Sequence, residues 1–360
     1  MSFLLINRRI TQRHPHFTAV LMLLILTAVV VINPLLAWAD SVIATVAVGG
    51  GPSTAAANLI TNRIYIANRA DNTVSVIDGS TNTMLGSPIP IGTKAVENSP
   101  NGIAVNSTTN RVYVVNITLN KSTFGSGTVS VIDGSNNTVL GGPIPVGNDP
   151  TMVAVNEASN RIYVANNDDD TVSVIDGNTN TVLGSPIPVG NNPQGLAVNV
   201  TTNRVYVANT RDNTVSVIDG NTNTVLGSPI RVGKNPNAVA VNATTNRVYV
   251  ANDTDNTVSV IDGNTNIVLG KSIPVGKSTE DRVMVGIVAN QTTNRVYVSN
   301  SADNTVSVID GSTNTVLGSP IPVGSIPRGI GVNTTTNYIY VANSDDDTMS
   351  IIDGSTSTTP

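Results

Sequence analysis

The chain has 360 residues, and only 12% of them are charged. Its formal net charge is -5, and it contains no cysteine. A chain of this length can bury a large core, and it must do so without disulfides. The acidic balance disfavours nucleic acid and anionic membranes as partners, because both carry negative charge. The only histidines, His14 and His16, and the only tryptophan, Trp38, all lie before residue 40.

Residues 1–39 have the pattern of an export signal peptide. Three arginines form a basic start, residues 17–32 are almost continuously apolar, and an Asn-Pro pair then interrupts the apolar run. Ala37 and Ala39 supply the small residues that signal peptidase requires. The alternative is an uncleaved membrane anchor, but the apolar run is short for a span of roughly 20 residues.

We therefore predict removal of residues 1–39 and export of residues 40–360 to a periplasm, the cell surface or the medium. Cleavage removes three arginines and no acidic residue, which takes the net charge from -5 to -8. No stable membrane insertion is expected after cleavage, and the mature chain contains no histidine, cysteine or tryptophan.

A compound repeat fills the mature chain and decides its fold. A phrase of the form Asn-Arg-(Val/Ile)-Tyr-(Val/Ile), with Tyr338 in place of the arginine in the last copy, is followed each time by a second phrase, (Val/Met)-Ser-(Val/Ile)-Ile-Asp-Gly. The tyrosines of the first phrase are Tyr65, Tyr113, Tyr163, Tyr206, Tyr249, Tyr297 and Tyr340, and the aspartates of the second are Asp78, Asp133, Asp176, Asp219, Asp262, Asp310 and Asp353.

Each repeat predicts four strands separated by turns. In the unit at 193–233 these are Gln194 to Val198, Arg204 to Ala208, Thr214 to Ile218 and Thr224 to Val232. Four-stranded units of about 40 to 45 residues are typical of propeller blades. The strands are apolar on both sides, as expected where both faces of a sheet pack against neighbours. We predict an all-β fold, a seven-bladed β-propeller with four-stranded antiparallel blades.

The two ends of the repeat region predict how the ring closes. Residues 42–49 resemble the fourth strand of a unit, whereas the C-terminal unit stops after its third strand at Asp353. We predict that residues 42–48 pair with residues 348–352, so that the N-terminal strand completes the last blade and no long strand edge is left unpaired.

The hexapeptide Arg-Val-Tyr-Val-Ala-Asn at 204–209 and the heptapeptide Thr-Val-Ser-Val-Ile-Asp-Gly at 214–220 resemble the repeat of the YVTN family of β-propellers. These are exported proteins of bacteria and archaea, and the resemblance covers nearly all of residues 42–354. It implies a propeller that acts as a binding platform or surface-layer component, although distant relatives are enzymes. The family has no shared catalytic motif to carry over.

The mature composition excludes several kinds of catalysis. Without histidine or cysteine there is no imidazole base, thiolate nucleophile, His-ligated metal or haem attachment motif. Paired carboxylates remain open as acid and base, but the acidic residues lie mostly in repeated turns. We therefore predict a protein that is not an enzyme and needs no cofactor.

Several aspartates raise the question of calcium, which prefers oxygen ligands from loops. They are Asp253, Asp255 and the triplets 168–170 and 345–347. Each replaces an Ala-Asp-Asn or Arg-Asp-Asn turn of another unit, and their spacing matches no calcium loop. We predict Asx-stabilised turns and no metal site.

Three insertions interrupt the repeat, because the tyrosine spacings are 48, 50, 43, 43, 48 and 43 residues. Two insertions, at Thr93–Ser99 and Lys277–Val285, lie between the fourth strand of one unit and the first of the next. The third, at Ile117–Gly127, lies between the second and third strands of its unit. In an up-and-down blade these connections emerge on one face of the disc, where binding loops are commonly grafted on a rigid scaffold.

We predict that this face, with the mouth of the central channel, binds a protein or polymer of the cell envelope. Phe124 either anchors a partner or folds down onto the disc, and the charges either contact a partner or are solvated. The candidate binding residues are Lys94, Glu97, Lys121, Phe124, Lys277, Glu280, Asp281, Arg282 and Arg328.

Two other functions stay open. A small ligand or a substrate could bind in the channel mouth, although the innermost strands are apolar. Nucleic-acid binding would need a basic stripe with aromatics, for which only Arg211, Arg231, Lys234 and Arg328 are available.

Overall fold

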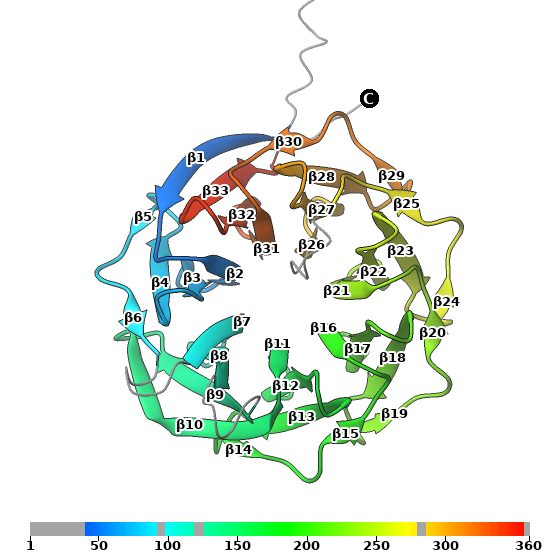
Figure 1. Cartoon of the computed structure of the whole chain (residues 1–360), viewed down its shortest axis with the longest axis horizontal. Helices are drawn as coiled ribbons and strands as arrows, with labels where there is room; N and C mark the ends of the chain where they lie inside the picture. Colours follow the sequence, from blue (N-terminus) through cyan, green and yellow to red (C-terminus); the bar gives the residue numbers. More distant parts are fainter. Residues whose placement is uncertain (1–39, 92–97, 119–125, 279–285, 356–360) are drawn as a thin grey trace, which may run out of the picture. The chain divides into compact units, whose positions relative to one another are not determined.

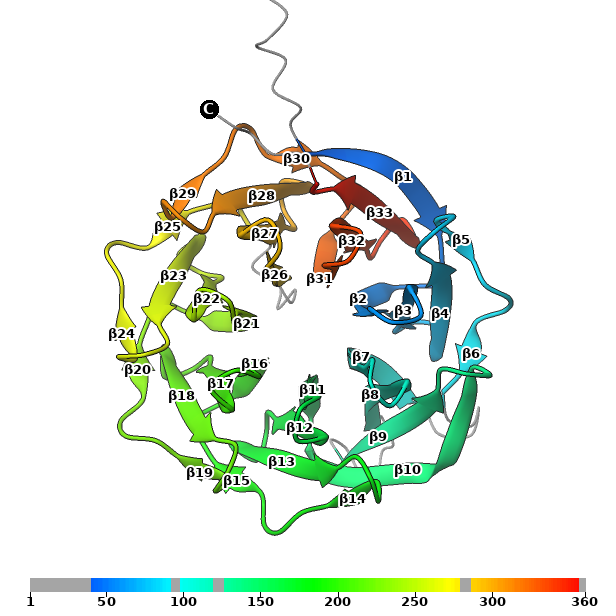
Figure 2. The ribbon, with the colours of Figure 1, turned by 180° about the vertical axis from the view of Figure 1, so that it is seen from behind.

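A computed structural model describes residues 40–91, 98–118, 126–278 and 286–355. Strands and turns form a ring of seven antiparallel sheets around a central channel, which Figures 1 and 2 show from its two faces. The predicted seven-bladed β-propeller is therefore confirmed. Within these ranges there is no helix that is long and apolar enough to cross a membrane. The predicted signal peptide lies outside the described residues.

The blades are numbered here along the chain, so that blade 1 begins with β2 and blade 7 with β31. The innermost strands line the channel, and the second strands carry the repeated tyrosine. The innermost strands are β2 (Pro52–Asn58), β7 (Asn98–Asn106), β11 (Pro150–Asn156), β16 (Pro193–Asn199), β21 (Pro236–Asn242), β26 (Ile287–Asn290) and β31 (Pro327–Asn333). The second strands are β3 (Arg63–Asn68), β8 (Arg111–Thr118), β12 (Arg161–Asn166), β17 (Arg204–Asn209), β22 (Arg247–Asn252), β27 (Arg295–Asn300) and β32 (Tyr338–Asn343).

The third and fourth strands form the outer part of each blade. The third strands are β4 (Thr73–Asp78), β9 (Ser126–Asp133), β13 (Thr171–Asp176), β18 (Thr214–Asp219), β23 (Thr257–Asp262), β28 (Thr305–Asp310) and β33 (Thr348–Asp353). The fourth strands are β5 (Thr83–Met84) with β6 (Ile89–Pro90), β10 (Thr138–Asn148), β14 (Thr181–Val182) with β15 (Ile187–Pro188), β19 (Thr224–Val225) with β20 (Ile230–Arg231), β24 (Ile267–Val268) with β25 (Ile273–Pro274), β29 (Thr315–Val316) with β30 (Ile321–Pro322), and β1 (Ser41–Ala47).

The predicted continuous fourth strand at 224–232 is wrong in detail. It consists of two short strands, β19 and β20, that both pair with β18 and leave a bulge between them. Gly227 lies in the bulge with a φ of 63°, which favours glycine, and Pro229 has no N–H to donate to a ladder. The repeated Leu-Gly-Ser-Pro segment therefore breaks the strand wherever it occurs.

The predicted ring closure is confirmed. Strand β1 pairs antiparallel with β33 from Ser41 opposite Asp353 to Ala47 opposite Thr348. Figure 1 shows β1 in blue beside β33 in red, at the outer edge of blade 7. The first strand of the domain thus completes the last blade.

The hydrophobic core lies between blades rather than within one blade. In one cluster, Tyr163 and Val172 of blade 3 pack with Val205 and Ile218 of blade 4. Equivalent clusters occur at the other blade boundaries, including the boundary of blade 7 with blade 1. All seven repeat tyrosines are fully buried in this way. Each buried valine or isoleucine contributes about 1.5–3 kcal/mol, so each blade is stabilised mainly by its neighbours.

A closed chain of asparagine pairs joins the blades on one face of the ring. Each innermost strand ends in a buried asparagine, whose side-chain amide donates to an asparagine of the next blade at 2.6–3.0 Å. The accepting asparagines have φ between 49° and 60°, a left-handed conformation that asparagine tolerates. Donor and acceptor pairs are Asn58 with Asn110, Asn106 with Asn160, Asn156 with Asn203, Asn199 with Asn246, Asn242 with Asn294, Asn290 with Asn337, and Asn333 with Asn62.

Candidate binding face

The connection face is defined here as the face that carries the links between blades and the turns between second and third strands. Its described links are 48–51, 147–149, 190–192, 233–235, 276–278 and 324–326, and its described turns are 69–72, 167–170, 210–213, 253–256, 301–304 and 344–347. The opposite face carries the asparagine pairs and the turns between third and fourth strands.

A repeated aspartate holds each link on the connection face to the turn of its own blade. In blade 4, the backbone N–H of Asn191 donates to Asp212 at 2.7 Å, and the Asn191 side chain donates to the same carboxylate. These hydrogen bonds lower the pKa of Asp212. Gly190 is required beside them, since a Cβ there would lie 2.6 Å from the Asn209 side chain. Equivalent aspartates are Asp71, Asp169, Asp255, Asp303 and Asp346.

A second side chain holds the same link to the turn of the preceding blade. Asp170 of blade 3 accepts the N–H of Asn192 at 2.7 Å, and Asp347 of blade 7 accepts the N–H of Gly51 at 2.8 Å. Asn213, Asn256 and Asn304 accept in the same way at other boundaries. The aspartate triplets thus contribute hydrogen-bond acceptors to the connections between blades. No group of three or more potential metal-ligating residues occurs among the described residues.

Only two of the predicted binding residues fall within the described parts of the chain. Lys94, Glu97, Lys121, Phe124, Glu280, Asp281 and Arg282 lie outside the described residues. Lys277 lies on the connection face with an exposed side chain, and its backbone N–H donates to Asp303 at 2.7 Å. Arg328 is the second residue of β31, where blade 7 begins on that face.

A further basic residue on this face, Arg69, was missed by sequence reasoning. Its Nε donates to the Ser99 hydroxyl of blade 2 at 2.9 Å. The equivalent residues Asn167 and Thr210 also bond to the next blade, through its backbone carbonyls. The sequence signal that could have identified Arg69 is its charge, because most repeats have a neutral residue at this position.

Asp253 occupies that same repeat position in blade 5 and is buried. Burial raises its pKa, and the nearby polar side chains of Ser278 and Asn235 oppose this shift; the Ser278 hydroxyl donates to the Asp253 backbone carbonyl at 3.2 Å. One carboxylate oxygen accepts from the Asn235 amide at 3.2 Å. The other oxygen is buried and has no hydrogen-bond partner among the described residues. The connection face therefore has one buried carboxyl group in blade 5 as well as basic residues elsewhere.

The basic residues considered for nucleic acid do not form one stripe. Arg211 and Lys234 are exposed on the connection face at blade 4 and at its link to blade 5. Arg231 lies on the outer strand β20, and Arg328 lies on an innermost strand of blade 7. The fold therefore separates Arg328 from the other three.

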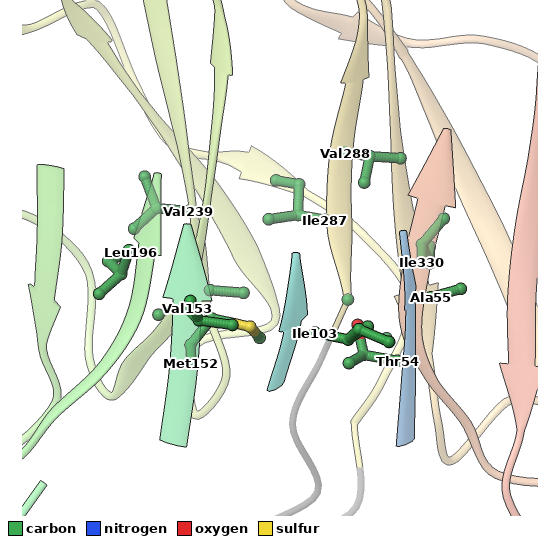
Figure 3. Close-up of a pocket in the computed structure, with 14 residues that line it drawn as sticks. Thr54, Ala55, Ile103, Met152, Val153, Leu196, Val239, Ile287, Val288 and Ile330 are labelled. Carbon is green, nitrogen blue, oxygen red and sulfur yellow. The ribbon is translucent and has the colours of Figure 1, made fainter. Parts of the chain in front are cut away.

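The central channel contains a cavity of about 200 Å³ lined by small and aliphatic side chains of the innermost strands. Figure 3 shows Met152, Leu196 and Ile287 among them, with Thr54 as the one lining residue that has a polar side chain. Drug-sized ligand pockets are commonly larger, about 300–1,000 Å³, and contain several polar groups. Apart from the Thr54 hydroxyl, this lining supplies no side chain that can act as an acid, base or nucleophile.

The architecture defines the chain as a seven-bladed β-propeller. It is similar in fold to a solved chain of hydrazine synthase from Kuenenia stuttgartiensis, with a TM-score of 0.70 over 85% of this chain and 96% of that chain. The two sequences are 16% identical, so this similarity concerns the fold alone. No family model and no curated protein matches the chain.

Proposed function

We propose that the protein is an exported, non-catalytic propeller of the YVTN repeat type that binds a protein or polymer of the cell envelope through its connection face. The phrase order of the repeats supports the family, and the basic and apolar pattern of residues 1–39 supports export. The lack of histidine and cysteine after residue 39 supports a role without catalysis.

The main support for a binding role is the uneven distribution of departures from the repeat. The opposite face repeats the asparagine pairs at every blade boundary, each with a structural function. The connection face carries the unusual charges Arg69, Lys277 and Arg328. Loops that vary on a rigid scaffold are common binding sites.

A pull-down from envelope extract of the source organism tests this proposal. The bait is the intact protein or a variant in which residues 117–127 and 277–285 are shortened to repeat length. Thr222→Ala, in an exposed turn on the opposite face, is the control. We expect a partner that the intact protein and the control retain and the shortened variant loses. Equal retention by all three proteins would contradict the assignment to the connection face.

A further inference from the structure

The innermost strands of blade 7 and blade 1 approach each other very closely at the ring seam. A Cβ on Gly329 of β31 would lie 2.5 Å from the Thr54 side chain and 2.6 Å from the Ser53 carbonyl oxygen of β2. Only glycine permits this approach. Arg328, the residue before Gly329, is therefore positioned beside the beginning of blade 1.

Arg69 lies at the end of blade 1 where β2 begins, which is also the end beside Arg328. Its neighbour Asn68 pairs with Pro52 at the start of β2, and the Arg69 backbone N–H donates to the Gly51 carbonyl at 3.0 Å. Ser53, which follows Pro52, also donates to the carbonyl of Ala67. Two arginines from different blades thus lie near the start of β2, Arg328 from blade 7 and Arg69 from blade 1, and the Arg69 side chain also bonds to Ser99 of blade 2.

Most hydrogen-bond donors of these two arginines have no acceptor among the described residues. The Arg328 Nε is buried and has no acceptor among the described residues. The one side-chain hydrogen bond of Arg69 within the described ranges joins its Nε to Ser99. At the position of Arg328, Ser53 and Thr151 instead carry hydroxyls that donate to carbonyls of the next blade. At this position Arg328 makes no such side-chain hydrogen bond to the next blade among the described residues.

The electrostatics of the seam disfavour a bare positive charge. Burial lowers the pKa of Arg328, and the nearby Arg69 lowers it further, whereas Asp345 raises it. The Asp345 side chain is exposed and forms no ion pair with Arg328 among the described residues. Two neighbouring guanidinium groups repel each other unless an anion lies between them, and an oxyanion accepts charge-assisted hydrogen bonds from both.

Backbone strain lies two residues before Arg328. Ile326 has a φ of 48°, although β-branched residues strongly disfavour positive φ. At the same position blade 4 has Asn192 and blade 5 has Asn235, with φ of 58° and 56°. Strained residues are concentrated at binding sites, where the surrounding structure holds them.

We propose that Arg69 and Arg328 form a binding site for a sulfate or phosphate group on the connection face, at the seam between blades 7 and 1. This inference rests on the proposed binding role of that face and gives its ligand a chemical class. The group belongs either to a free inorganic ion or to an anionic polymer, in which case the site anchors one group of the chain. The acidic net charge of the protein limits binding elsewhere on the surface.

Isothermal titration with inorganic sulfate, dextran sulfate and uncharged dextran tests the site. The proteins are the wild type, Arg69→Gln, Arg328→Gln, Asp345→Asn and the control Arg211→Gln, which changes an exposed arginine on the same face. We expect Arg328→Gln and Arg69→Gln each to weaken sulfate binding about tenfold or more, because each removes charge-assisted hydrogen bonds. Asp345→Asn should tighten binding several-fold, and Arg211→Gln should leave it unchanged.

Thermal unfolding without sulfate separates a binding role from a structural one. Arg328→Gln should keep or raise the thermal midpoint, since it removes a partly buried charge whose Nε has no acceptor among the described residues. A lower midpoint would identify Arg328 as a structural residue and overturn the site. Added sulfate should raise the midpoint of the wild type and leave that of Arg328→Gln unchanged.

The outcomes also separate this site from the proposed function. Absence of sulfate binding, or binding that the two arginine variants do not weaken, overturns the anion site. Dextran sulfate binding that persists in Arg328→Gln indicates dispersed surface attraction and overturns it as well. Sulfate binding with the expected variant pattern supports the anion site even when no envelope partner is captured. Failure to capture a partner would contradict only the proposed function.

Discussion

Asp40 joins the N-terminal strand to blade 6, and removing its charge should destabilise the whole ring. Its carboxylate pairs with the Arg295 guanidinium and accepts a hydrogen bond from the Tyr297 hydroxyl at 2.7 Å. The two charged side chains are only 4% and 8% exposed. Asp40 is followed directly by β1, which completes blade 7. The ion pair therefore contributes to ring closure as well as to local packing.

The substitution Asp40→Asn preserves shape but removes the negative charge that faces the buried Arg295 guanidinium. Breaking a buried ion pair in this way costs about 3–5 kcal/mol. For a domain of this size that corresponds to a fall in the thermal midpoint of about 5–8 °C. The measurement is thermal unfolding followed by circular dichroism, at neutral pH and constant salt.

The neighbouring blade offers a matched control. Arg247 occupies the same repeat position as Arg295 but pairs with Asp262, and these side chains are 31% and 19% exposed. Arg247→Gln should therefore cost less than about 1 kcal/mol, whereas Arg295→Gln should resemble Asp40→Asn. The double variant of Asp40 and Arg295 should be less destabilised than the sum of the single ones. Equal midpoints for Asp40→Asn and the wild type would refute the reasoning.

Three further changes test separate parts of the structure. Ile326→Asn should stabilise the fold by about 1–2 kcal/mol in urea unfolding, because asparagine relieves the positive φ, and an unchanged stability would contradict the strain argument. Asp253→Asn should raise the midpoint at pH 7: burial raises the pKa of Asp253, so its contribution to stability falls as pH rises from about 4 through that raised pKa. The difference in thermal midpoint between Asp253→Asn and the wild type should shrink below about pH 4. A difference that does not change with pH would exclude the ionisation of Asp253 as its cause. Asn199→Ala should cost about 2–3 kcal/mol by leaving buried hydrogen-bond groups unpaired, whereas Thr222→Ala should cost less than about 0.5 kcal/mol; similar costs would contradict a structural role for the asparagine pairs.

The fold was predictable because the sequence contains seven copies of the same blade repeat. Strand periodicity, turn residues and the incomplete first and last units together predicted the blade number and the pairing of β1 with β33. The broken fourth strand was not predicted, because apolar residues on both sides of Gly227 fit a strand until the backbone conformation is known.

The candidate site was predictable only in part. Irregular spacing pointed to the connection face as the candidate binding face, but most of the residues chosen from it lie outside the described parts of the chain. Arg69 was missed because its relation to Arg328 depends on contact between the first and last blades, 259 positions apart. Likewise, the repeated asparagines resembled ordinary turn residues, since their bonds to the next blade follow only from the closed ring.

The central claim, binding through the connection face, is tested most directly by site-specific photocrosslinking in envelope extract. A photoreactive benzoylphenylalanine replaces either Lys277, exposed on the connection face, or Asn221, exposed on the opposite face. The account predicts a crosslinked partner from position 277 and none from position 221. A partner captured from position 221 alone, or equally from both positions, would contradict it.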